Sequence, residues 1–176
     1  NSFGLAVDPQ TGFMWDTENG ADVYDEINLV EKKFNSGWAK IQGFSNGQSL
    51  PQIPQYSEYI YSEPEFSWEI PIGVTAIEFP NSNDFINYKD FLFVADTNNG
   101  IIYKFKLDET RKNFIFESPH LQDNVLNMLE DSSGTEPIDE IIFAKNLGLI
   151  TDMKFGPDGA LYVISLMEGK IYKISS

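Results

Sequence analysis

Three segments of the chain repeat one pattern of short apolar strands and tight turns, and this repetition limits the fold more than any other feature. The segments lie near residues 1–42, 72–116 and 138–176. Each contains runs rich in Ile, Val, Phe and Tyr, separated by turn sequences such as Asn-Gly and Pro-Asp-Gly. Such turn residues tolerate positive φ, so each segment is typical of a meander of β-strands. The pattern predicts an all-β chain made of repeated sheets.

The composition of the strands indicates how these sheets pack. Residues 161–164 are all apolar, whereas a strand with one face in water alternates apolar and polar residues. Both faces of such a sheet must therefore be covered, as they are in a β-propeller, where each blade lies between two others. Closed propellers use roughly four to eight blades, and this chain offers about three. We therefore expect part of a β-propeller with four-stranded antiparallel blades.

Two stretches interrupt the repeated pattern. Residues 43–70 are rich in proline and polar residues, which predicts a long connection or insertion with room for one irregular strand. Residues 117–137 are polar and acidic, and we expect them to form a surface insertion. Within that insertion, apolar residues recur at helical spacing over residues 121–130 and predict one short amphipathic helix.

Charge and composition exclude several classes of function. The chain has 12 basic and 27 acidic residues, a formal net charge of -15, so it would repel a phosphate backbone and nucleic acid is not an expected partner. No apolar run approaches the ~20 residues that span a bilayer, so membrane insertion is not expected either. Cysteine is absent and His120 is the single histidine, which rules out thiolate sites and histidine metal clusters within this chain.

The loop after the first tight turn carries the most informative polar residues. The carboxylates of Glu18, Asp22, Asp25 and Glu26 surround loop carbonyls near Gly20. Carboxylate and carbonyl oxygens are the hard ligands that calcium prefers. Asp and Asn also close turns by bonding their own backbone, so the residues alone leave a calcium site and a purely structural loop equally open.

Several motifs, taken together, resemble one family. They are Asn1-Ser2-Phe3-Gly4-Leu5-Ala6, Thr17-Glu18-Asn19-Gly20, Asp25-Glu26-Ile27-Asn28, Asn35-Ser36-Gly37-Trp38 and Gly156-Pro157-Asp158-Gly159. In this order they resemble the soluble glucose/sorbosone dehydrogenases, which are six-bladed β-propellers that use pyrroloquinoline quinone (PQQ) and calcium to oxidise aldose sugars. The resemblance spans essentially the whole chain and corresponds to the C-terminal half of such a propeller. It implies a periplasmic or extracellular location. Because the sequence starts at Asn1 without a methionine, we expect processing or truncation.

The resemblance also assigns roles to individual residues. Asn1 is similar to the asparagine that contacts the quinone. Gly20 and Ala21 occupy the positions whose backbone carbonyls hold the catalytic calcium, with Ala21 in place of the usual proline. Glu26 and the backbone of Ser36, where the family usually has tyrosine, resemble a second, structural calcium site.

Other family features are missing from this sequence. The catalytic histidine of the family belongs to an earlier blade, so no catalytic residue is assigned here. The Arg-Ile-Arg-Asp run of active members corresponds to Leu149-Ile150-Thr151-Asp152, and an expected lysine aligns near Asn98. PQQ is a tricarboxylate, and the loss of its bidentate cationic partners weakens its binding.

Two functional hypotheses therefore stand side by side. The first is a PQQ- and calcium-dependent sugar dehydrogenase-like propeller that oxidises aldose sugars when complete. The second is a non-catalytic, calcium-stabilised binding module of the cell envelope, whose partner is an envelope polymer or another protein. In both cases the exposed blade faces demand a partner, either the missing half of the propeller or a second copy that closes the ring.

Overall fold

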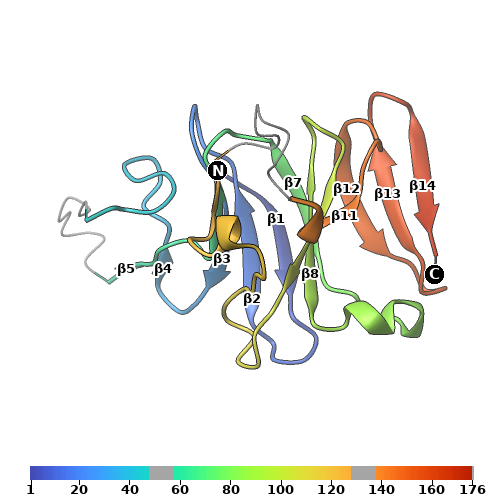
Figure 1. The fold of residues 1–176 in the computed structure, drawn as a ribbon, viewed down its shortest axis with the longest axis horizontal. Helices are drawn as coiled ribbons and strands as arrows, with labels where there is room; N and C mark the ends of the chain where they lie inside the picture. The colour runs from blue at the N-terminus through green and yellow to red at the C-terminus, as the bar shows by residue number, and fades with distance from the viewer. Residues whose placement is uncertain (48–57, 128–137, 176) are drawn as a thin grey trace.

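The computed structural model describes residues 1–47, 58–127 and 138–175, and three sheets stand side by side in it (Figure 1). The first sheet has the order β1 (Ser2–Val7), β2 (Met14–Glu18), β3 (Asp25–Val30), β6 (Phe66–Trp68) and β10 (Val125–Leu126). The second has the order β11 (Ile142–Ala144), β9 (Ile102–Lys106), β8 (Phe91–Asp96) and β7 (Val74–Glu78). The third has the order β12 (Ile150–Phe155), β13 (Leu161–Ser165) and β14 (Lys170–Ile174).

Smaller elements lie in the connections between these strands. The strands β4 (Phe34–Asn35) and β5 (Ile60–Tyr61) form a short parallel pair beside the first sheet. Three 3₁₀ helices are described: η2 (Asn83–Tyr88), η3 (Pro119–Leu121) and η4 (Ile138–Glu140). Within the described ranges, no helix has the length and apolar character needed to cross a membrane.

The arrangement of the first strands confirms a partial β-propeller. Strand β7 packs between β1 and β12, which open the first and third sheets. Each of the three strands shifts register near its start, between Ser2 and Gly4, between Val74 and Ala76, and between Ile150 and Asp152. A β-bulge at the same place in each sheet shows that the three sheets repeat one blade design.

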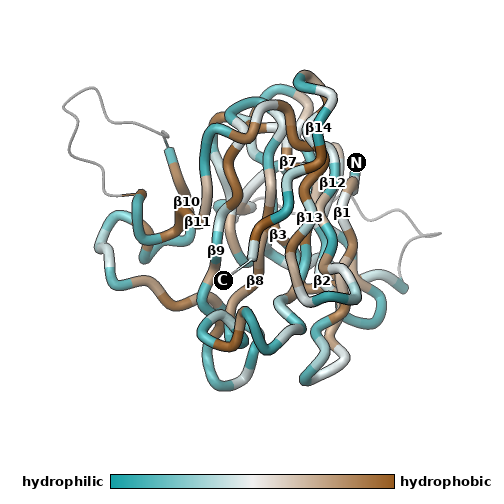
Figure 2. The backbone as a smooth tube through the Cα atoms, turned by 90° about the vertical axis from the view of Figure 1, so that its right-hand side faces the viewer, coloured by the Kyte–Doolittle hydropathy of each residue, from teal (hydrophilic) through white to brown (hydrophobic). Residues whose placement is uncertain are grey.

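The core lies in two layers on either side of the middle sheet. Along β8, Leu92 and Val94 join the apolar cluster shared with the first sheet, whereas Phe93 and Ala95 join the cluster shared with the third. This two-sided burial explains why the strand has no polar alternation. Figure 2 shows the brown, apolar stretches gathered along the packed strands.

Both completed sheets take their fourth strand from a distant part of the chain. Strand β6 lies within residues 43–70, which the sequence indicated as a connection, and it pairs antiparallel with β3. Strand β11 lies within the third repeated segment, yet it pairs with β9 of the second sheet. Short strands inside long connections have little periodicity of their own, so pairing with an open sheet edge decides their place.

The amphipathic helix predicted for residues 121–130 is wrong over its described part. Leu121 ends η3, Asn124 has a left-handed φ of 61°, and Val125–Leu126 form β10. Strand β10 pairs parallel with β6, and the carbonyls of Asn124 and Leu126 accept backbone hydrogen bonds from Ser67 and Glu69. The unpaired edge of β6 thus takes up this segment, because buried backbone groups need partners. Residues 128–130 lie outside the described residues.

One buried ion pair ties the first two sheets together. The Arg111 guanidinium donates to Asp8 from Nε at 2.6 Å and from Nη2 at 3.0 Å, and Nη1 donates to Asp90 at 3.2 Å. Asp8 is fully buried and Arg111 is almost so. The turn after β1 is therefore joined to the loop after β9 by a buried bidentate contact, and one further bond links Arg111 to the partly exposed Asp90 just before β8.

Candidate functional site

Asn1 lies beside the loop that follows β2. The Asn19 backbone N–H donates to the Asn1 carbonyl at 3.1 Å, and the Asn1 side-chain amide donates to the Asn19 carbonyl at 3.0 Å. The Asn19 side chain in turn donates to the Val74 carbonyl at 2.9 Å. The structure thus brings Asn1 to the residue before Gly20, and it ties this loop to the second sheet.

Asp25 fixes the loop after β2 by accepting hydrogen bonds from its backbone and from residues 72–74. Its Oδ1 accepts the Gly20 N–H at 3.0 Å, and its Oδ2 accepts the N–H groups of Ile72 at 2.8 Å, Gly73 at 2.7 Å and Val74 at 3.3 Å. The side chain is 0% exposed, and burial raises its pKa even though these hydrogen bonds act to lower it. Both oxygens of Asp25 are occupied by backbone amides, so this carboxylate organises the loop.

Gly20 and Ala21 present backbone oxygens from this held loop. A Cβ atom on Gly20 would lie 1.9 Å from the Val23 carbonyl oxygen, so only glycine fits there. The Ala21 N–H donates to the side-chain oxygen of Gln42 at 2.9 Å. The carbonyls of Gly20 and Ala21 accept no hydrogen bond from any described residue. Such carbonyls suit a hard cation.

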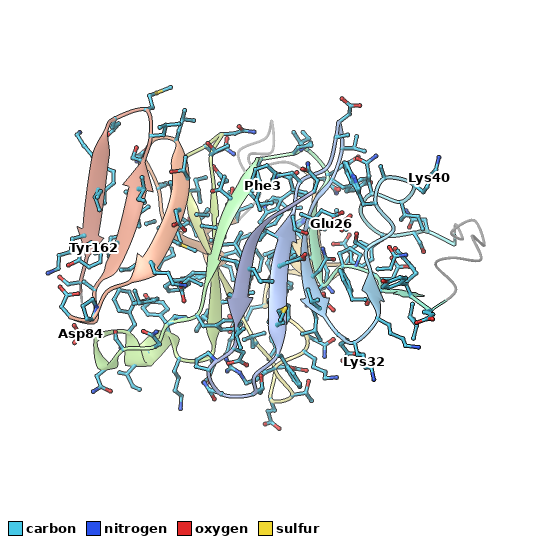
Figure 3. All side chains as sticks on the ribbon, turned by 180° about the vertical axis from the view of Figure 1, so that it is seen from behind. Phe3, Glu26, Lys32, Lys40, Asp84 and Tyr162 are labelled. Carbon is cyan, nitrogen blue, oxygen red and sulfur yellow. The ribbon has the colours of Figure 1, made fainter. Side chains whose placement is uncertain are left out.

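Next to the loop, one face of the first sheet carries a buried set of polar side chains. Register places Asp16 opposite Asn28, Glu18 opposite Glu26, and Glu26 opposite Ser67, so all five share that face. They are all buried, and Glu26 is only 2% exposed. We call them the carboxylate cluster, and Figure 3 shows Glu26 between the strands of the first sheet and the loop that carries Lys40.

Burial dominates the electrostatics of the carboxylate cluster. Burial, together with the neighbouring charges of Glu18 and Asp16, raises the pKa of Glu26 to about 8. The pKa values of Glu18 and Asp16 are also raised by burial. The Asp16 Oδ1, the Asn28 Oδ1 and the Ser67 Oγ find no hydrogen-bond partner among the described residues. Buried acceptors without donors require a cation, a proton or water.

The segment after β4 covers the cluster and joins it to the loop. The Ser36 hydroxyl donates to Glu18 Oε2 at 2.9 Å, and the Gly43 N–H donates to Glu26 Oε1 at 2.5 Å. Gly43 has a φ of 68°, and a Cβ there would lie 2.6 Å from the Tyr24 ring. Because Gln42 binds Ala21 and its neighbour Gly43 binds Glu26, one short segment connects both groups of predicted residues.

The structure separates the candidate carboxylates into different roles. Glu18 and Glu26 lie in the cluster, Asp25 anchors the loop, and Asp22 is exposed. Asp16 and Asn28 had no site role in the sequence analysis, although Asn28 belongs to one of the quoted motifs. The polar alternation of Asp16 with Glu18 and of Glu26 with Asn28 was the available signal. Over the described residues, no three acidic or histidine side chains stand in the arrangement of an assembled metal site.

The positions where cationic quinone partners were expected hold no cation. Ile150 is fully buried in the core, whereas Thr151 and Asp152 are exposed. The charged side chain of this run is therefore the Asp152 carboxylate, which is an anion where a guanidinium was expected. Asn98 is exposed, and its side-chain amide donates to the Pro71 carbonyl at 3.4 Å.

Comparison with known proteins agrees with this fold. A family model described as Glucose / Sorbosone dehydrogenase matches residues 1–173. The chain is 25% identical over 182 residues to aldose sugar dehydrogenase YliI of Escherichia coli K12, an alignment that covers 99% of this chain and 42% of that protein.

Two solved structures show the same fold at lower identity. A crystal structure of glucose dehydrogenase superposes with a TM-score of 0.69 at 21% identity, covering 100% of this chain and 45% of that one. The PQQ-bound form of aldose sugar dehydrogenase from Streptomyces coelicolor has a TM-score of 0.58 at 17% identity, covering 94% and 37%. The chain therefore spans less than half the length of these proteins. The family match over nearly every residue shows that the chain belongs to the Glucose / Sorbosone dehydrogenase family.

Proposed function

We propose that this chain forms the calcium-binding part of a sugar dehydrogenase-type propeller. The observation that carries the proposal is the pair of carbonyls at Gly20 and Ala21, which accept no hydrogen bond from the described residues and lie on a loop that Asp25 holds in place. A pre-formed loop lowers the ordering cost of binding. In this proposal the Gly20 and Ala21 carbonyls hold one calcium ion.

A second calcium ion would bind at the carboxylate cluster. Glu26 and Glu18 face each other there, and Ser36 is joined to Glu18 by its hydroxyl. The Ser36 carbonyl accepts no hydrogen bond from the described residues. The buried acceptors of Asp16, Asn28 and Ser67 complete an all-oxygen environment, which fits calcium and neutralises carboxylates whose charge is costly to bury.

A quinone with three carboxylates does not fit the residues of this chain alone. Asn1 lies beside the calcium loop and can supply one amide. The run from Leu149 to Asp152 offers no guanidinium, and Asp152 adds a negative charge that opposes a carboxylate ligand. Binding of PQQ would therefore depend on cations from outside these residues.

For the complete protein, we propose oxidation of aldose sugars in the periplasm or outside the cell. The support is the family and the relative YliI, which is an aldose sugar dehydrogenase. The second candidate is a non-catalytic, calcium-stabilised module of the cell envelope that binds a polymer or a protein. The replacement of the arginine run by Leu149-Ile150-Thr151-Asp152 favours this second candidate, since shared ancestry does not secure activity.

The covered and uncovered faces of the blades indicate what completes the fold. Phe3 is 64% exposed, Leu5 is 62% exposed, and Val7 and Met14 are also exposed on the first sheet. Figure 3 shows Phe3 on the surface of β1. An apolar face of this kind is typically buried by a partner. We propose that the rest of the propeller or a second copy of the chain covers it.

Calorimetric titration of the chelator-treated protein with calcium, and then with PQQ at saturating calcium, tests these proposals. We expect two calcium ions per chain, and one in Glu26→Gln, with Glu109→Gln as an exposed control of equal charge change. Tight PQQ uptake followed by sugar-dependent reduction of an artificial acceptor would establish the dehydrogenase. Calcium binding without PQQ uptake would show that these residues alone do not hold the quinone, and it would favour the non-catalytic module. Absence of calcium binding would refute both calcium sites.

A further inference from the structure

The outer edge of the second sheet contains a pocket that the proposed function does not use. Its volume is about 310 Å³, at the lower end of the range for small-molecule sites. Its lining combines apolar and charged side chains: Phe91, Lys104, Lys106, Ile115, Phe116, Glu117, Glu140 and Ile141. None of these residues belongs to the calcium loop or the carboxylate cluster.

Two lysines and an aromatic ring share the floor of this pocket. Lys104 and Lys106 are two residues apart on β9, so their side chains leave the same face of the sheet. Phe91 lies directly opposite Lys106 on β8 and therefore shares that face. The spacing of about 6.6 Å along the strand allows both ammonium groups to approach one ligand group.

The two walls of the pocket are fixed to β9 and to each other. The Lys104 N–H donates to the Ile141 carbonyl at 2.7 Å, and the Ile115 N–H donates to the Lys106 carbonyl at 2.8 Å. Glu140 then joins the walls, because its carboxylate accepts the backbone N–H groups of Glu117 at 2.7 Å and Ser118 at 2.8 Å. The pocket is therefore formed before any ligand arrives.

The lining of the pocket carries two lysines and two glutamates, and the lysines are the groups that can pair with an anionic ligand. Four other lysines of the described chain pair with carboxylates, whereas no ion pair among the described residues involves Lys104 or Lys106. Among the described residues, both ammonium groups therefore remain available to an acidic group of a ligand. Glu140 is occupied by two backbone amides, and the exposed Glu117 at the rim opposes a second negative charge on a ligand.

We propose that this pocket binds a small organic monocarboxylate with an aromatic or branched aliphatic body. The carboxylate would pair with the Lys104 and Lys106 ammonium groups, and the apolar body would lie against Phe91, Ile115 and Phe116. Charge-assisted hydrogen bonds supply orientation, and apolar contact supplies the remaining affinity. This site is independent of calcium and of sugar oxidation.

Phenylacetate is the probe for this site, and its uncharged analogue phenylacetamide is the matched control ligand. The assay is a titration of the intact, ¹⁵N-labelled protein followed by ¹H–¹⁵N correlation spectra. We expect saturable shifts of the amides of residues 104–106, 115–117 and 140–141 with phenylacetate. Phenylacetamide should bind about tenfold more weakly or worse, because it forms no charge-assisted bond.

The variant Lys104→Gln/Lys106→Gln should lose about tenfold or more in phenylacetate affinity. Lys32→Gln/Lys40→Gln removes the same charge from the side of the first sheet, as Figure 3 shows, and should bind as the unaltered protein does. Equal binding of phenylacetate and phenylacetamide by the unaltered protein would overturn the proposal. So would absence of saturable shifts at the pocket, or equal loss of affinity in both double variants.

Discussion

Replacing Asp25 with asparagine tests whether this buried carboxylate holds the loop that carries Gly20 and Ala21. The two oxygens of Asp25 accept four backbone N–H groups, one from Gly20 and three from residues 72–74. An asparagine has one oxygen, which can keep the three bonds to residues 72–74. Its NH₂ group would then face the Gly20 N–H, and two donors cannot bond.

The structure gives the size of this effect. A buried N–H left without an acceptor costs about 1–3 kcal/mol. Removal of a carboxylate whose ionised form is disfavoured by burial returns part of that cost. We expect Asp25→Asn to lower the free energy of unfolding by about 1–2 kcal/mol. Asp25→Ala should lower it by about 3 kcal/mol or more, because it leaves all four donors without acceptors.

Urea unfolding and calcium calorimetry are the assays. Release of Gly20 should also weaken calcium binding at the Gly20 and Ala21 carbonyls by about tenfold, since the loop must be ordered on binding. Asp22→Asn is the matched control, because Asp22 is an exposed carboxylate in the same loop. If Asp25→Asn unfolds at the same urea concentration as Asp22→Asn, the anchoring role is refuted.

Three further predictions concern pH, the buried ion pair and the uncovered blade face. Burial raises the pKa of Glu65 from its ordinary value of 4.5 to about 7. Between these two pH values the folded state holds a proton that the unfolded state releases, so the free energy of unfolding should fall by about 1–3 kcal/mol as pH rises from 4.5 to 7. Glu65→Gln should reduce that slope in urea unfolding at several pH values, and an unchanged slope would contradict the assignment. Arg111→Met leaves Asp8 buried without its partner and should cost about 3 kcal/mol, whereas Arg111→Met/Asp8→Asn should recover part of the loss in thermal unfolding. Light scattering after size exclusion should show the isolated 176 residues as a dimer or an aggregate. A stable monomer would contradict the proposal that a partner buries Phe3 and the neighbouring apolar side chains.

The repeated turns and apolar runs were sufficient to predict three antiparallel sheets of a propeller. Local chemistry explains this success, because Asn-Gly and Pro-Asp-Gly turns join strands that are adjacent both in the chain and in the sheet. The apolar run at residues 161–164 predicted sheets buried on both faces. Strand β8 of the middle sheet is buried on both faces, whereas Ile164 of the third sheet is 41% exposed. The motifs that contain Gly20 and Asp25 likewise indicated the position of the loop, and its binding of calcium stays a prediction.

Only the tertiary structure decided which distant segments complete the sheets and which polar groups meet. The strands Phe66–Trp68 and Ile142–Ala144 are too short to show a strand pattern in the sequence. Their place is decided by pairing with the open edges of the first and second sheets. The same edge effect turned the expected helix after Leu121 into strand β10. Asp16 and Glu26 meet only because strand register aligns them on one face, and Asp25 becomes an anchor only because residues 72–74 lie above it. The sequence determines these contacts only through the whole fold, because each joins residues that no local pattern links.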